Sequence, residues 1–123
     1  MKYKIIIGAF LVAIIPALFS SCSSTSDTLY SWNNYEAVSY KYSKDPSEKN
    51  LLELQKCFEK ITSQPSGQRK VVPPGILAEY AYLLYKQGKK EQAIEMMNRE
   101  IEAYPESKEF IDKMLEMGFV VNE

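Results

Sequence analysis

Side chains suited to catalysis are few in this chain of 123 residues. It contains no histidine, the residue that most often serves as general base, as metal ligand and as activator of a serine or cysteine nucleophile. Its two cysteines, Cys22 and Cys57, are too few for a metal cluster or a disulfide framework. The sequence also has no glycine-rich phosphate loop. We therefore expect no metal and no cofactor.

Three glutamates, Glu79, Glu95 and Glu100, are the remaining candidates for acid–base chemistry. Glu95 follows Glu91 by four residues, which is the spacing of a solvated helix face. Glu100 falls where two predicted helices would touch, so we expect it to be partly buried. A structural salt bridge to a lysine or arginine explains such a residue at least as well as catalysis does. We expect a protein that is not an enzyme; the alternative is a cell-envelope enzyme that uses Glu100.

The composition is that of an ordinary globular protein. Apolar residues make up 46% of the chain and charged residues 25%, as in a single soluble-type domain. Lysine and arginine together number 15 against 16 acidic residues, for a net charge of −1. This balance provides no basic surface for nucleic acid, so we expect no nucleic-acid partner.

The N-terminal residues have the pattern of a signal peptide. A short basic stretch, Met1–Lys4, precedes 15 residues without a charge, 5–19, interrupted only by Gly8 and Pro16. A membrane-spanning helix needs about 20 apolar residues, so this run is too short to span and is typical of a signal-peptide core. We predict that residues 1–21 are removed.

Cys22 follows the small residues Ser20 and Ser21, and residues 18–22 resemble the lipobox of bacterial lipoproteins, although Phe19 departs from its usual aliphatic residue. The resemblance implies that the Cys22 thiol carries a diacylglycerol and that its amine is acylated, typically with palmitate. Residues 22–28 would then be the lipidated cysteine and a flexible polar tether. No aspartate follows Cys22, so the expected location is the periplasmic face of the outer membrane. The alternative is an ordinary signal peptide with a chance cysteine.

The second cysteine has the setting of a core residue. Cys57 lies among Leu51, Leu54, Phe58 and Ile61, which recur at helical spacing. No histidine is available to lower its pKa, and a free cysteine in apolar surroundings is unreactive. We predict a buried, inert thiol.

The remainder of the chain is predicted to be all-α, with about five helices in a single domain over residues 29–123. Apolar residues recur at three and four positions, and prolines and glycines separate the periodic segments. Ser31 and Ser47 are candidate N-caps, Pro74 a candidate first helical residue, and residues 64–73 a polar, solvated loop containing Arg69 and Lys70. The expected helices are 31–44, 47–63, 74–87, 89–104 and 107–118.

Residues 74–107 span 34 positions, the period of a tetratricopeptide repeat. Gly88 would occupy the turn and Pro105 the end of the repeat, whereas Glu100 replaces the usual small residue. The expected packing positions are Leu77, Tyr80, Ala81, Leu84, Ala93 and Met97. We predict a tetratricopeptide-like hairpin, which an unrelated αα-hairpin would resemble closely. A degenerate hairpin before it and a last helix after it would complete one small core.

Several blocks of the mature sequence resemble domain-of-unknown-function family 4810, a family of small bacterial lipoproteins. The blocks are Leu29-Tyr30-Ser31-Trp32 with Tyr35 and Tyr40, Val72-Pro73-Pro74-Gly75, Gly88, Ala93, Glu100, Tyr104-Pro105-Glu106-Ser107 and Phe110. The family has no established activity. The resemblance implies an accessory part of an outer-membrane assembly, alongside a lipoprotein similar to the curli secretion channel.

The function that these observations favour is a lipid-anchored module for binding proteins of the cell envelope. The first helix of a tetratricopeptide hairpin lines a groove, and here that face would present Ala78, Tyr82, Tyr85 and Lys86. Tyrosine is enriched in binding hot spots. The alternatives are that Tyr82 and Tyr85 are merely half-exposed, or that the protein is a structural envelope spacer without a discrete groove.

Overall fold

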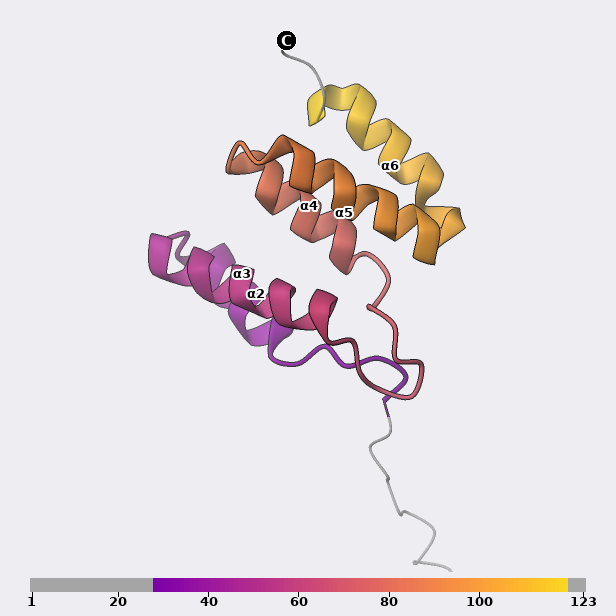
Figure 1. Ribbon diagram of the computed structural model, residues 1–123. Coiled ribbons are helices and arrows are strands. Elements are labelled where there is room, and N and C mark those ends of the chain that lie inside the picture. The colour runs from indigo at the N-terminus through magenta and orange to yellow at the C-terminus, as the bar shows by residue number, and fades with distance from the viewer. Residues whose placement is uncertain (1–27, 120–123) are drawn as a thin grey trace, which may run out of the picture.

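A computed structural model describes residues 28–119, and in this part of the chain every regular element is helical (Figure 1). The all-α prediction is confirmed. The predicted signal peptide, Cys22 and nearly all of the tether lie outside the described residues. The elements are α2 (Tyr35–Lys44), α3 (Glu48–Ser63), α4 (Ile76–Lys86), α5 (Lys90–Ala103), the 3₁₀ turn η2 (Pro105–Ser107), α6 (Lys108–Met114) and the π-type turn η3 (Leu115–Phe119).

The helices form two hairpins and a terminal helix that stack in chain order (Figure 1). Helices α2 and α3 make the first hairpin, α4 and α5 make the second, and α3 packs on α4. Contact is most extensive between α4 and α5, where Ala81 and Ala93 are both fully buried. Small side chains at these positions let the two helix axes approach closely. Because α4 contacts α3 on one side and α5 on the other, it lies in the middle of the stack.

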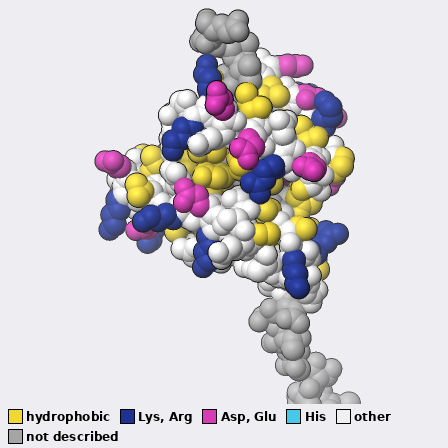
Figure 2. Space-filling model, viewed as in Figure 1, with side chains coloured by type: hydrophobic (Ala, Val, Ile, Leu, Met, Phe, Trp, Pro, Cys, Tyr) yellow, Lys and Arg dark blue, Asp and Glu magenta, His cyan; other side chains and the backbone are white. Residues whose placement is uncertain are grey.

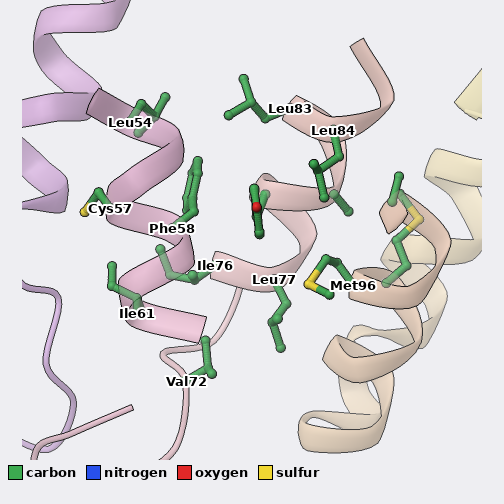
Figure 3. Close-up of a cluster of buried hydrophobic side chains, with 14 of the residues drawn as sticks. Leu54, Cys57, Phe58, Ile61, Val72, Ile76, Leu77, Leu83, Leu84 and Met96 are labelled. Carbon is green, nitrogen blue, oxygen red and sulfur yellow. The ribbon is translucent and has the colours of Figure 1, made fainter. Parts of the chain in front are cut away.

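The core lies on both sides of α4. Figure 3 shows Leu54, Phe58 and Ile61 of α3 on one side of this helix and Met96 of α5 on the other. Every packing position predicted for the 34-residue segment is buried. Cys57 is buried as predicted, and this burial raises the pKa of its thiol.

Two predicted helix starts are wrong. Helix α2 begins at Tyr35 rather than Ser31, because Asn33 has a left-handed φ of 49° that a right-handed helix cannot contain. The backbone N–H of Ser31 instead joins the chain to the loop before α4, since it donates to the carbonyl of Ser66 at 3.1 Å. Helix α4 begins at Ile76 rather than Pro74. Gly75 before it has a φ of 87°, so Pro74 belongs to a turn that a left-handed glycine closes.

The other helix ends follow the sequence signals. Gly88 has a φ of 77° directly after α4, as expected of a glycine that terminates a helix. Ser47 precedes α3, and α5 lies within one residue of its predicted bounds. The last helix was expected to stop at Gly118, but the chain coils on through η3 to Phe119.

The loop before α4 holds the first described residues in place. The N–H of Gln68 donates to the carbonyl of Thr28 at 3.1 Å, and that of Arg69 to the carbonyl of Leu29 at 3.0 Å. Gly67 lies so close to this segment that a Cβ there would be 2.9 Å from the backbone of Tyr30. Arg69 is exposed, as expected of a solvated loop, and it donates a hydrogen bond to the Tyr30 hydroxyl at 2.6 Å.

Candidate functional site

A cleft of about 460 Å³ opens between α4, the end of α5 and α6. Its size is within the range of ligand-binding pockets. It is lined by Gly75, Ala78, Glu79, Tyr82, Glu100, Ser107, Phe110 and Met114.

The cleft exists because α6 leans on α5 and η2 rather than on α4. Pro105 begins η2 and ends the preceding helix, since proline cannot continue the backbone hydrogen bonding of α5. The fully buried Ile111 fixes α6 to the core. Helix α6 has no extensive contact with α4, so the space between these two helices stays open.

Glu100 lies at the floor of the cleft and is 1% exposed. It follows Ala93 and Met97 at the spacing of one buried helix face. Its Oε1 accepts hydrogen bonds from the N–H of Gly75 at 2.7 Å and from the Ser107 hydroxyl at 3.3 Å. Its Oε2 is buried and has no hydrogen-bond partner within residues 28–119.

A salt bridge was one of the two explanations considered for Glu100, and within residues 28–119 no ion pair of Glu100 is found. The ion pairs of the described chain join Lys41 to Glu53, Lys108 to Asp112 and Lys113 to Glu109. Instead of a cation, Glu100 meets the N-terminal end of α4, where backbone N–H groups carry partial positive charge. This contact compensates one carboxylate oxygen and leaves the other uncompensated.

The walls of the cleft are apolar and aromatic, and its charge is negative. Tyr82 is 46% exposed and Phe110 60% exposed, while Ala78 is buried between them and Glu100. The charged residues of the lining, Glu79 and Glu100, are both acidic. On the face of the molecule drawn in Figure 2, by contrast, acidic and basic side chains are interspersed.

Glu79 also joins α4 to α2. It accepts a hydrogen bond from the hydroxyl of Tyr35. Burial, followed by this hydrogen bond, raises the pKa of Tyr35 to about 12. The Tyr35 ring lies 5.8 Å from that of Phe58, which stacks on Tyr80 at 5.3 Å. This aromatic chain ties the first hairpin to the second and fixes the position of Glu79.

The four residues of the predicted binding face do not line one common surface. Ala78 and Tyr82 line the cleft. Tyr82 and Lys86 line a second groove of about 270 Å³ between α2, α3 and α4, and the Lys86 Nζ lies 5.1 Å from the centre of the Tyr82 ring. Tyr85 lines neither hollow; it is half-buried against the core.

Two of the three glutamates considered for acid–base chemistry lie in the cleft, and the third does not. Glu79 and Glu100 line the same cleft, whereas Glu95 is exposed on α5 and lies away from it. Within residues 28–119, no group of three or more cysteine, aspartate or glutamate side chains could hold a metal ion. In the same part of the chain, no helix has the length and apolar character needed to cross a membrane.

Phe110, Ser107 and Gly75 are cleft residues that the sequence did not identify. Phe110 belongs to the last predicted helix, 107–118, whose apolar residues also include Ile111, Met114 and Leu115. Ile111 is fully buried, whereas Phe110 is 60% exposed. Adjacent apolar pairs elsewhere in the chain, such as Leu83 with Leu84 and Met96 with Met97, are buried together. The sequence alone therefore gave no signal that Phe110 faces outward.

The fold and the cleft define a class of small all-α protein: stacked helical hairpins with a ligand-sized hollow under the last helix. A family model described as Domain of unknown function (DUF4810) matches residues 29–114, and the chain belongs to this family. This assignment confirms the resemblance noted in the sequence. Comparison with curated proteins and with solved structures gives no match to this chain.

Proposed function

We propose that this protein is a lipid-anchored interaction module on the periplasmic face of the outer membrane. The lipobox-like residues before Cys22 support the anchor. The family resemblance supports an accessory role in an assembly that contains a lipoprotein similar to the curli secretion channel. The helical stack supports a binding role, because such stacks commonly present concave surfaces to partners.

The observation that carries the binding role is the cleft between α4 and α6. It combines two exposed aromatic walls, Tyr82 and Phe110, with a buried polar floor at Glu100. Binding hot spots have this composition: large aromatic side chains surround a hollow that a partner can fill, and the partner displaces the water from it.

Affinity capture tests this proposal. The lipidated protein is captured from detergent-solubilised envelopes, and proteins that co-purify in a fixed ratio are identified by mass. The double variant Tyr82→Ala/Phe110→Ala should weaken capture by about 2 kcal/mol or more, the scale of a lost hot spot. Both side chains are substantially exposed, so the variant should fold. Tyr85 is left intact because it contributes to the core.

Tyr40→Ala is the matched control, because Tyr40 is an exposed tyrosine on α2 and does not line the cleft. It should capture partners as the wild type does. Wild-type capture by the folded double variant would refute the binding role of the cleft. Changing the length of the tether would then be the decisive experiment: a structural spacer depends on that length and not on the aromatic walls.

A second candidate function, an enzyme of the cell envelope, is favoured by one observation. Glu79 and Glu100 line the same cleft, and paired carboxylates can act as general acid and base. Incubation of purified peptidoglycan or phospholipid with the wild type and with Glu100→Gln, followed by mass spectrometry, tests this function. Products formed by the wild type and absent with the variant would establish an enzyme.

A further inference from the structure

We propose that the cleft binds a lysine side chain of a partner polypeptide, with the lysine ammonium on Oε2 of Glu100. This inference rests on the proposed function, because it specifies the chemistry of the partner that the module recognises.

The first argument is the uncompensated oxygen. Buried polar atoms in native proteins nearly always have a partner, and a buried charge without one is strongly unfavourable. Oε2 of Glu100 is buried and unpartnered, in a residue that lines an open cleft. A donor that enters the cleft would supply the missing interaction.

The second argument is charge. Both charged residues of the lining are acidic, so the cleft attracts a cation and repels an anion. Within the described part of the chain, no lysine or arginine lines the cleft, and basic residues on the surrounding helices have partners of their own. Lys86 lies over the Tyr82 ring, Arg99 donates to the carbonyl of Thr62 at 3.1 Å, and Lys108 pairs with Asp112 at 2.6 Å.

The third argument distinguishes lysine from arginine. A guanidinium binds a carboxylate best through two parallel hydrogen bonds, one to each oxygen. In Glu100, Oε1 already accepts hydrogen bonds from Gly75 and Ser107, so only Oε2 is available. A compact ammonium suits a single acceptor. The apolar stem of lysine would pack against Ala78 and Met114, and the ring of Phe110 can also attract its charge.

The fourth argument favours a polypeptide over a free amine. Beyond Phe110 and Met114, which line the cleft, the apolar side chain of Met117 follows three residues later. Phe110 and Met117 are 60% and 81% exposed. Contiguous exposed apolar surface is typical of protein interfaces, and methionine adapts well to a partner.

The test is an NMR titration of the ¹⁵N-labelled mature lipoprotein in detergent micelles. The probes are N-acetyl-lysine methylamide, its uncharged norleucine analogue, and n-butylamine, which has the amine without the peptide groups. The amide signals of Gly75 and Ser107 report on the cleft, because both residues contact Glu100. The variants are Glu100→Gln and, as a matched control, Glu95→Gln at an exposed position on the same helix.

We expect the lysine probe to shift both signals to saturation and to bind at least about ten-fold more tightly than the norleucine probe, as one charge-assisted hydrogen bond allows. Glu100→Gln should weaken the lysine probe about ten-fold or more, and Glu95→Gln should not change it. Butylamine should bind more weakly than the lysine probe.

Equal binding of the lysine and norleucine probes, no shift at Gly75 and Ser107, or full binding to Glu100→Gln would each overturn the inference. Equal binding of butylamine and the lysine probe would overturn the polypeptide partner. The comparison of probes on the wild type needs no variant, so it decides the question even where Glu100→Gln does not fold. Successful envelope capture without lysine binding would refute this inference alone, whereas failed capture would refute the proposed function.

Discussion

At the scale of single residues, Glu100 combines a structural contact with an unsatisfied atom. Its Oε1 holds the N–H of Gly75 at the start of α4, while its Oε2 is buried without a partner. Groups kept for binding often reduce stability, because the free protein lacks the interaction that the ligand supplies. Glu100 should therefore show opposite effects on stability and on binding.

Replacement of Glu100 by glutamine should raise the free energy of unfolding by about 1 kcal/mol, because burial of a neutral amide costs less than burial of a charge. The amide oxygen can still accept from Gly75 and Ser107. Urea unfolding at neutral pH, followed by circular dichroism, measures the change. Glu95→Gln is exposed and should stay within about 0.5 kcal/mol of the wild type. A less stable Glu100→Gln would mean that the carboxylate is kept for its structural contact.

The sequence indicated Glu100 as unusual but could not identify its neighbours. An acidic residue at a helical packing position is visible in the sequence, and its burial was expected. Its contacts come from Gly75 and Ser107, 25 and 7 residues away, and they depend on how α6 turns at η2. Such contacts depend on tertiary geometry, so the sequence suggested the more common explanation, a salt bridge.

At the scale of elements, Tyr104 fastens the end of α5 to the segment before α4. Its hydroxyl donates to the carbonyl of Val72 at 2.6 Å. Burial, and then hydrogen bonding to Tyr30, raises the pKa of Tyr104 to about 12. Hydrogen bonds to Tyr104 and Arg69 lower the pKa of Tyr30. This contact joins the α4–α5 hairpin to the loop that holds the N-terminal segment.

Tyr104 should make stability depend on alkaline pH. Its pKa in the folded protein is raised from 10 to about 12, so its contribution is complete below pH 10 and is lost as the pH rises toward 12. Tyr104→Phe should cost about 1 kcal/mol at pH 8, through the lost hydrogen bond, and less at pH 11.5. Urea unfolding of the wild type and the variant at the two pH values measures how far the difference in their free energies of unfolding decreases. Tyr40→Phe, at an exposed site, is the control, and a constant difference for Tyr104→Phe would contradict the expectation.

The boundaries of the elements show what local signals can predict. Gly88 and Pro105 end helices through their own backbone properties, so their effects were predictable. Ser31 was a reasonable N-cap, but Asn33 after it has a left-handed φ of 49°, and the Ser31 segment is joined to the backbone of Ser66, 35 residues away. Pro74 was a reasonable first helical residue, but the left-handed Gly75 follows it. Predictions failed where a distant backbone or a neighbouring φ angle determined the local conformation.

At the scale of the whole molecule, the domain would be held close to the membrane. Residues 28–31 are pinned to the loop at 66–69, so the tether can extend only between Cys22 and Thr28. Six extended residues span about 20 Å. If Cys22 carries lipid, Thr28 therefore lies within about 20 Å of the membrane surface, and partners that are themselves anchored there, as other envelope lipoproteins would be, can reach the domain.

The anchor itself makes the last prediction. Metabolic labelling with palmitate should mark the wild-type protein, because the proposed acyl chains at Cys22 would incorporate the label. Two or three such chains would also hold the protein stably in the membrane fraction. Cys22→Ser should lose the label and leave the membrane fraction. Cys57→Ser is the matched control, because Cys57 is the other cysteine of the chain and is buried in the core. It should keep the label, since a buried thiol with a raised pKa is a poor nucleophile. Label that persists in Cys22→Ser would refute the lipid anchor at Cys22. It would also refute the inference that the domain is held close to the membrane.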